Sequence, residues 1–321
     1  MCRRSAAQIL APLQTLLCLA GFITVAAAAP GSHSFDVGGR AMHLECRGGG
    51  LPAVILDAGL GGTAADWTVI QQTLANEQLV CVYDRAGYGA SAAGPKPRSS
   101  ARIAAELRTL LARADIPPPY ILGGHSFGGF NMRLFASLFP HDVAGLVLVD
   151  PPHEQLGGLL EGVLLSRIDP NGVLSGLWQA GGLSALVDVI EPFGVALGLD
   201  LARARAVASE LDAFPQSMAE AQAAQIAPTL PLIIIAHGQR VLPPGPLGDR
   251  LEREWLALLR ETACTHPLGR YREALQAAHM IPLEQPAIVV AALREVAGDT
   301  PDDELAWERA TTCAADDDLT P

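Results

Sequence analysis

Basic side chains are scarce in this sequence. Its 321 residues include 22 Lys and Arg against 34 Asp and Glu, which gives a formal net charge of −12 at pH 7. Nucleic acids and anionic membrane surfaces are bound through basic patches, so the charge balance argues against both as partners. Part of the acidity is concentrated in residues 299–321, where a solvated, partly disordered tail is the simplest interpretation.

Cysteine is also infrequent, and the first two of the six cysteines lie in an N-terminal segment with the composition of a signal peptide. Arg3 and Arg4 precede an apolar, charge-free run over residues 9–25, and small residues follow up to residue 29. We therefore expect residues 1–29 to be a secretory signal peptide and the protein to be secreted or periplasmic. A retained N-terminal membrane anchor is the alternative, because the run is near the length that spans a bilayer.

Export would leave the other four cysteines in an oxidising compartment, where an even number permits disulfides. Of the possible pairs, Cys264 with Cys313 is favoured. Cys46 and Cys81 fall in expected strands and are interpreted as small buried hydrophobic residues.

Residues 30–321 are expected to form one α/β domain. Half of the residues are apolar, which is enough for a large core. A hairpin is expected over residues 35–46, and apolar runs typical of strands then alternate with helical patterns at residues 52–57, 79–83, 118–122, 145–149 and 232–236. This alternation predicts a mostly parallel central sheet flanked by helices on both faces. Ligands bind such sheets at the carboxyl ends of the strands. The residues expected there are 59–62, Asp84, Ser126 and Asp150.

The stretch YILGGHSFGGFNM, residues 120–132, contains the pattern G-x-S-x-G at residues 124–128. In this pattern a strand turns sharply into a helix and holds a serine hydroxyl at the apex. The glycines suit such a turn, because the strand and the helix pass too close for a Cβ. The pattern also describes a glycine-rich loop that happens to contain serine. The apolar run before it and the helical spacing after it favour Ser126 as a nucleophile.

Five motifs follow one another in a characteristic order. They are DAGLGGTAADW from residue 57, DRAGYGAS from 84, GGHSFGG from 123, VLVDPPHE from 147 and AAHMIPLEQPAIVVAALREV from 277. In their order and spacing the chain resembles the α/β-hydrolase fold superfamily over nearly all of its length after the signal segment. Within it the chain is similar to serine hydrolases of the carboxylesterase-like type. The resemblance implies that dehalogenases and epoxide hydrolases would carry Asp where this chain has Ser126.

A serine hydroxyl needs a base near neutral pH. The resemblance implies a late histidine ahead of the last helix, and His279 occupies that place before the helix expected over residues 288–296. A surface-loop histidine is the alternative interpretation. His125, beside the serine, is interpreted as structural, with its side chain pointing away from the site. His153 and His237 lie near strand ends, where they could line the pocket.

The acid is missing from the place that many relatives use. The strand over residues 232–236 is followed by Gly238, and residues 239–241 supply no carboxylate. Part of the superfamily places the acid at the end of the preceding strand, and that position here is Asp150. It would accept a hydrogen bond from the base and fix its tautomer. The alternatives are an Asp150 that only caps the next turn, with Asp249 or Glu154 as the acid.

The resemblance assigns the oxyanion hole to the backbone amides of Leu60 and Phe127. Ala58 stands where relatives often have His. Because the hole uses main-chain N–H groups, this departure should leave it intact.

Residues 153–228 interrupt the alternation with helix-like apolar clusters, and we expect them to form a helical cap inserted after the strand that ends at Asp150. Pockets are lined mostly by hydrophobic side chains, so an apolar cap favours an apolar acyl or alcohol group in the substrate. Most of these side chains would also serve simply to pack the cap onto the core.

The sequence therefore predicts an exported serine hydrolase that cleaves a small-molecule apolar ester through Ser126, His279, Asp150 and an acyl-enzyme. No metal or organic cofactor is implied, and no stable membrane insertion is expected after removal of the signal. An acyltransferase or amide hydrolase with the same triad is one alternative, and a non-catalytic ligand-binding protein of the same fold is another. The natural substrate and the oligomeric state do not follow from the sequence.

Overall fold

The computed structural model describes residues 31–156, 182, 184, 187, 200–298 and 310–311. The expected signal peptide, most of the expected tail and the central part of the expected cap lie outside these ranges. None of the helices in the described ranges combines the length and the apolar character needed to cross a membrane.

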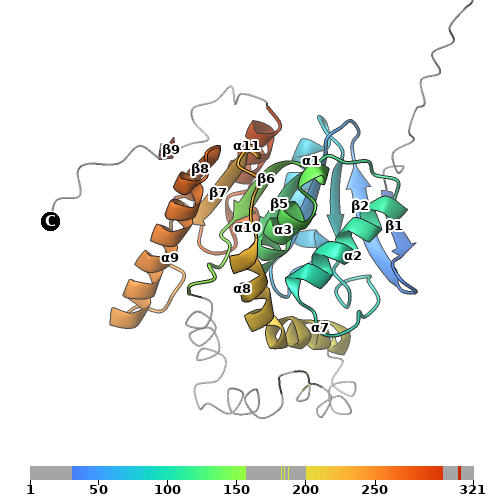
Figure 1. The fold of residues 1–321 in the computed structure, drawn as a ribbon, viewed down its shortest axis with the longest axis horizontal. Coiled ribbons are helices and arrows are strands. Elements are labelled where there is room, and N and C mark those ends of the chain that lie inside the picture. Colours follow the sequence, from blue (N-terminus) through green and yellow to red (C-terminus); the bar gives the residue numbers. More distant parts are fainter. Residues whose placement is uncertain are drawn as a thin grey trace, which may run out of the picture.

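A mostly parallel sheet runs through the described part of the protein, with the nine strands in the order β1-β2-β4-β3-β5-β6-β7-β8-β9 (Figure 1). Strands β3 to β8 pair in parallel, whereas β1, β2 and β9 join antiparallel at the two edges. The strands are β1 (Gly31–Asp36), β2 (Ala41–Arg47), β3 (Ala53–Asp57), β4 (Val80–Tyr83), β5 (Tyr120–His125), β6 (Val143–Val149), β7 (Leu232–His237), β8 (Gly269–Ala274) and β9 (Ala310–Thr311).

Helices cover both faces of the sheet, which is why the central strands are apolar without interruption. Along β6, Leu146 and Leu148 pack into a core with α2, α3 and α9, whereas Val147 and Val149 pack into a second core with α1 and α11. The predicted parallel sheet between two helical layers is confirmed. The helices are η1 (Ala64–Trp67), α1 (Thr68–Leu74), α2 (Ser100–Arg113), α3 (Phe127–Leu138), η2 (Pro140–Asp142), α7 (Leu201–Asp212), α8 (Phe214–Ala223), α9 (Pro246–Thr265), α10 (Ile281–Glu284) and α11 (Pro286–Val296).

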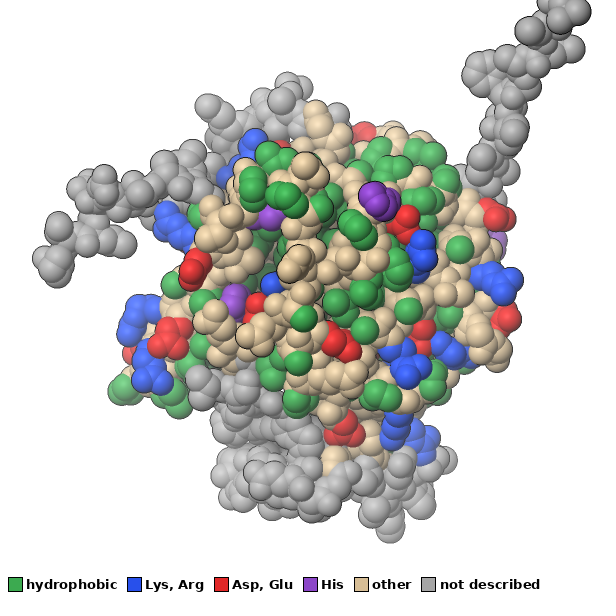
Figure 2. Space-filling view, viewed as in Figure 1, with side chains coloured by type: hydrophobic (Ala, Val, Ile, Leu, Met, Phe, Trp, Pro, Cys, Tyr) green, Lys and Arg blue, Asp and Glu red, His purple; other side chains and the backbone are tan. Residues whose placement is uncertain are grey.

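The inserted segment between β6 and β7 is described mainly by α7 and α8, which lie together at one end of the sheet (Figure 1). On the face seen in Figure 2, Lys and Arg side chains lie beside Asp and Glu side chains, with apolar side chains between them.

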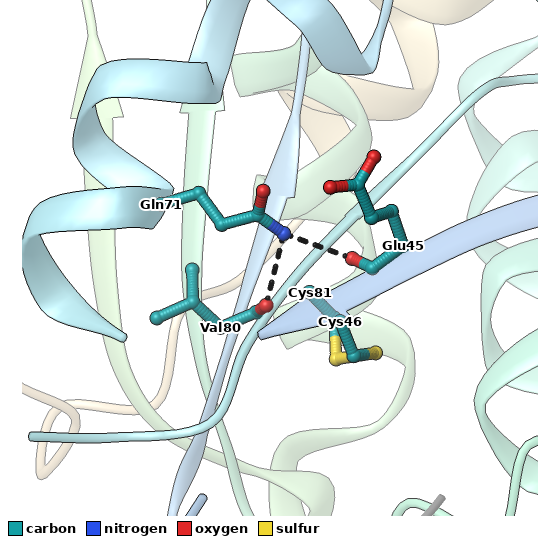
Figure 3. The surroundings of a disulfide bond; sticks show 5 residues. All are labelled: Glu45, Cys46, Gln71, Val80 and Cys81. Atoms are coloured by element: carbon teal, nitrogen blue, oxygen red, sulfur yellow. Dashed lines mark hydrogen bonds between the residues drawn. A yellow bond between two sulfur atoms is a disulfide. The ribbon is translucent and has the colours of Figure 1, made fainter. Parts of the chain in front are cut away.

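A disulfide joins Cys46 of β2 to Cys81 of β4. Both cysteines are buried, but their interpretation as simple buried hydrophobic residues is wrong, because they form a disulfide. The two strands are antiparallel neighbours that place the cysteines opposite each other, with their Cα atoms 4.1 Å apart. Beside the disulfide, Gln71 of α1 donates to the backbone oxygens of both strands (Figure 3). Cys264 is also disulfide-bonded, and its predicted partner Cys313 lies outside the described residues.

Candidate active site

Ser126 lies at a sharp turn between β5 and α3, at the carboxyl edge of the sheet. Its backbone has φ +51° and ψ −122°, a conformation that costs free energy for any residue with a Cβ. The turn requires glycine on both sides. A Cβ on Gly124 would lie 2.4 Å from the backbone oxygen of Gly128, and a Cβ on Gly128 would lie 2.4 Å from that of Asp57. The geometry is that of the nucleophile elbow expected from the motif.

The structure brings Ser126, His279 and Asp150 together in one hydrogen-bonded chain. His279 follows β8, and its Nε2 lies 2.9 Å from the Ser126 Oγ. Its Nδ1 lies 2.7 Å from Oδ2 of Asp150, the residue after β6. A carboxylate only accepts, so the Nδ1 of His279 carries the proton and its Nε2 faces the serine hydroxyl as an acceptor.

Asp150 is fully buried and has positive φ. Burial alone would raise its pKa, but hydrogen bonds from His237 and His279 outweigh that effect and lower the pKa to about 2. The carboxylate is therefore ionised at neutral pH and is able to stabilise an imidazolium at His279.

His237 holds the other oxygen of this carboxylate. Its Nδ1 lies 2.7 Å from Asp150 Oδ1, and its backbone N–H donates to the same atom at 3.2 Å. On the far side of the ring, Nε2 lies 3.2 Å from a carboxylate oxygen of Glu252, outside hydrogen-bond geometry. Sequence position alone allowed His237 and His153 to line the pocket, but neither of them is among the residues that line the cavity. Both side chains are buried.

His125 faces the candidate site, and the expectation that it points away is wrong. Along β5 its side chain shares a face with Ile121, which packs in the same core as Ile281, two residues after His279. The His125 Nε2 donates to the backbone oxygen of His279 at 2.7 Å. Burial first, and then the neighbouring His279, lower the pKa of His125 to about 4, so the ring is neutral at pH 7. Its contact is with the loop that carries the predicted base.

The two other candidate acids are engaged elsewhere. Asp249 pairs with Arg240 on the surface. Glu154 accepts from Arg133 at 2.9 Å. Of the three carboxylates considered, only Asp150 contacts His279.

The Ser126 hydroxyl and the His279 ring open into a cavity of about 500 Å³ whose described lining is mostly apolar. Helices α7 and α8 of the expected cap contribute to its walls. Among the described residues, no group of three or more His, Cys, Asp or Glu side chains is arranged to hold a metal ion. The apolar lining residues are Leu60, Phe127, Pro152, Leu211, Phe214, Val241, Leu242, Trp255 and Met280.

The backbone amides of Leu60 and Phe127 are available to a ligand. Leu60 lies in the turn after β3, Phe127 is the first residue of α3, and both line the cavity. Within the part of the chain that the structure describes, neither N–H donates to a protein acceptor. The first amides of a helix also carry partial positive charge. The pair is suited to bind an anionic oxygen next to Ser126.

A family model described as the alpha/beta hydrolase fold matches residues 52–182. The uncharacterized protein YqjL of Bacillus subtilis is 33% identical over 119 residues, which are 37% of this chain and 47% of that protein. Matches of this kind span about half or less of the length of the curated relatives.

Solved structures share the fold at low identity. A thermophilic esterase from Thermogutta terrifontis has a TM-score of 0.56 and 21% identity, covering 82% of this chain and 97% of its own. The enol-lactonase from Burkholderia xenovorans LB400 has a TM-score of 0.54 and 19% identity, covering 83% of this chain and 100% of its own. With the sheet order and the serine elbow, these matches show that the chain has the α/β-hydrolase fold.

Proposed function

We propose that this protein is an exported serine hydrolase that cleaves esters with an apolar acyl or alcohol group. The observation that carries the proposal is the hydrogen-bonded chain Ser126–His279–Asp150 at an apolar cavity. In that arrangement a hydroxyl, a base with a fixed tautomer and a buried carboxylate are already aligned, as acyl transfer requires.

The reaction would proceed in two acyl transfers. As Ser126 Oγ attacks the ester carbonyl, His279 Nε2 takes its proton, and Asp150 stabilises the resulting imidazolium. The carbonyl oxygen becomes an oxyanion held by the amides of Leu60 and Phe127. His279 then returns the proton to the leaving alcohol. Water, activated by the same base, releases the acyl group from Ser126.

Export is supported by the sequence of the first 29 residues and by the disulfide between Cys46 and Cys81, since disulfides persist in oxidising compartments. Expression of the full chain in a bacterium with a signal peptidase tests this part of the proposal. The mature protein should be recovered outside the cytoplasm with its N-terminus near residue 30. Recovery in the membrane fraction with an intact N-terminus would instead favour the anchor.

The activity is tested by hydrolysis of p-nitrophenyl esters from acetate to laurate by residues 31–321. Ser126→Ala should abolish turnover, and Asp150→Asn should lower kcat by about 10³- to 10⁴-fold, because the tautomer of the base is no longer fixed. Asp249→Asn is the matched control and should leave kcat unchanged. An Asp150→Asn variant that keeps full activity would show that Asp150 is not the acid, and loss of activity in Asp249→Asn beside it would assign that role to Asp249.

The same assay separates hydrolysis from transfer to an alcohol. With an added alcohol acceptor, a hydrolase releases mainly free acid, whereas an acyltransferase yields mainly the new ester. A panel of p-nitroanilides tests whether amides are cleaved as well.

A further inference from the structure

A fully buried arginine lies behind the turn that carries Leu60. Arg85 follows β4, and its side chain uses all five of its N–H donors. Two of them, on Nε and Nη2, donate to the carboxylate of Glu210 at 2.8 and 3.0 Å. The two on Nη1 donate to Asp57 Oδ1 at 2.8 Å and to the backbone oxygen of Ala58 at 2.5 Å. The fifth, on Nη2, donates to the backbone oxygen of Gly59 at 2.9 Å.

Two hydrogen bonds to the Gly59 carbonyl, one from Arg85 and one from the Gly62 N–H at 3.0 Å, fix the direction of the Leu60 amide. The Gly59 carbonyl and the Leu60 N–H belong to one peptide unit, which is planar and trans, so the two groups point in opposite directions. Arg85 holds the carbonyl toward the protein interior. The Leu60 N–H is therefore directed to the opposite side of the peptide, where Leu60 borders the cavity.

A lysine at this position could not make the same set of contacts. A lysine has three donors on one atom and cannot reach the two carbonyls and two carboxylates in the same plane. Glu210 and Asp57 both raise the pKa of Arg85 against the effect of burial, so the guanidinium stays charged. Its central carbon also lies 5.6 Å from the ring centroid of Phe127, the residue that carries the second amide.

Glu210 connects this arginine to the inserted segment. It lies on α7, is fully buried and also accepts a hydrogen bond from the Tyr88 hydroxyl at 2.6 Å. Helix α7 packs closely against the loop after β4 at this point, since a Cβ on Gly87 would lie 2.8 Å from the Cβ of Ala206. The orientation of the turn after β3 thus depends on the docking of α7.

We propose that Arg85 is a positioning residue that sets the Leu60 N–H for oxyanion binding, and that Glu210 makes this setting depend on the docked position of α7. The inference rests on the proposed function, because it assigns the Leu60 amide a role in the reaction. Loss of the Arg85 contacts with Gly59 should weaken binding of the transition state more than binding of the ester, because only the transition state carries an oxyanion.

The test compares Arg85→Lys with Arg98→Lys in residues 31–321. Arg98 is also a buried arginine, but its hydrogen bonds, at 2.8 Å, go to the two oxygens of Glu106 and not to the turn after β3. The measurements are kcat and KM for a p-nitrophenyl ester, and Ki for an alkyl trifluoromethyl ketone. Addition of Ser126 to this ketone forms a hemiketal whose oxyanion needs the same amides. Glu210→Gln is the second variant, in case Arg85→Lys does not fold.

Arg85→Lys should lower kcat by about 10- to 100-fold and raise Ki for the ketone by a similar factor, with KM changed by less than about threefold. Glu210→Gln should show the same pattern at about a tenfold effect. Arg98→Lys should change neither constant. Equal effects of Arg85→Lys and Arg98→Lys, or a fall in kcat without a rise in Ki, would overturn the positioning role. A parent protein without Ser126-dependent turnover would overturn the proposed function and this role together.

Discussion

Two histidines share the carboxylate of Asp150, one on each oxygen. His279 contacts Oδ2 from the cavity side, and His237 contacts Oδ1 from the interior. The ring of His237 is further enclosed by Trp255, with the ring centroids 4.8 Å apart. His237 therefore fixes the carboxylate in the orientation that His279 requires. Residues 239–241, which follow β7, include no Asp or Glu.

We expect His237→Gln to destabilise the fold more at pH 5.5 than at pH 9. Burial alone would lower the pKa of His237, but the hydrogen bond and charge of Asp150, together with the charge of Glu252, outweigh burial and raise the pKa above the ordinary 6.5. Its contribution to stability is then complete below pH 6.5 and is lost as the pH rises through the raised value. Asp150 behaves in the opposite way, since its contribution is complete above pH 3.8 and is lost as the pH falls toward 2.

Urea unfolding of the parent and of His237→Gln at both pH values measures this difference. The loss of unfolding free energy should be larger at pH 5.5. An equal loss at the two pH values would mean that His237 has the same pKa in the folded and in the unfolded protein, which would contradict the prediction.

Helix α8 contributes an aromatic wall to the cavity. Phe214, at its first turn, lies 6.0 Å from the ring centroids of both Phe127 and Phe130 of α3. It also lines the cavity, so its size limits the space beside Ser126.

Phe214→Ala should shift the preferred p-nitrophenyl ester toward longer or bulkier acyl groups, because removal of the ring enlarges the cavity. The ratio of kcat/KM for laurate to that for acetate measures this shift. Phe139→Ala is the control, since Phe139 is also half-buried and packs on Phe135 but does not line the cavity. If the two variants have the same acyl-length profile, Phe214 does not limit the cavity.

Elements with strong local patterns were predictable from the sequence. The buried strands from β3 to β7 are apolar at every or nearly every position, and their boundaries follow from that. Strand β8 and helix α9 were not predicted from the sequence. Strand β8 has the sequence GRYREA, and its charged residues interrupt the apolar pattern that is typical of a buried strand. One of them, Arg272, is buried and paired with Glu295 of α11, a contact that only the folded chain creates.

Some residues of the candidate site could likewise be predicted from local motifs, and others could not. Ser126, His279 and Asp150 each stand in a motif, and the sequence was enough to nominate them. Arg85 and His237 act through partners 26 and 87 positions away, so their contacts could not be predicted. The available signal for Arg85 was its place in DRAGYGAS, directly after a buried strand.

At the scale of the whole molecule, the disulfide ties the antiparallel edge to the parallel sheet. We expect Cys46→Ala/Cys81→Ala to lower the free energy of unfolding by about 4 kcal/mol, the loop-closure value for a sequence separation of 35. Chemical denaturation of the oxidised parent and the double variant measures the difference. Turnover at 25 °C should be unchanged, since neither cysteine lines the cavity. A difference near zero would show that the unfolded chain is not constrained by this bond.

Ser126 as an activated nucleophile is tested most directly by a fluorophosphonate probe and mass mapping of the labelled residue. The parent should acquire one adduct, on Ser126, and His279→Ala should react at least about a hundredfold more slowly, because the serine has lost its base. Ser126→Ala should not react. An unlabelled parent, or a probe that labels Ser126→Ala as fast as the parent, would contradict the serine mechanism.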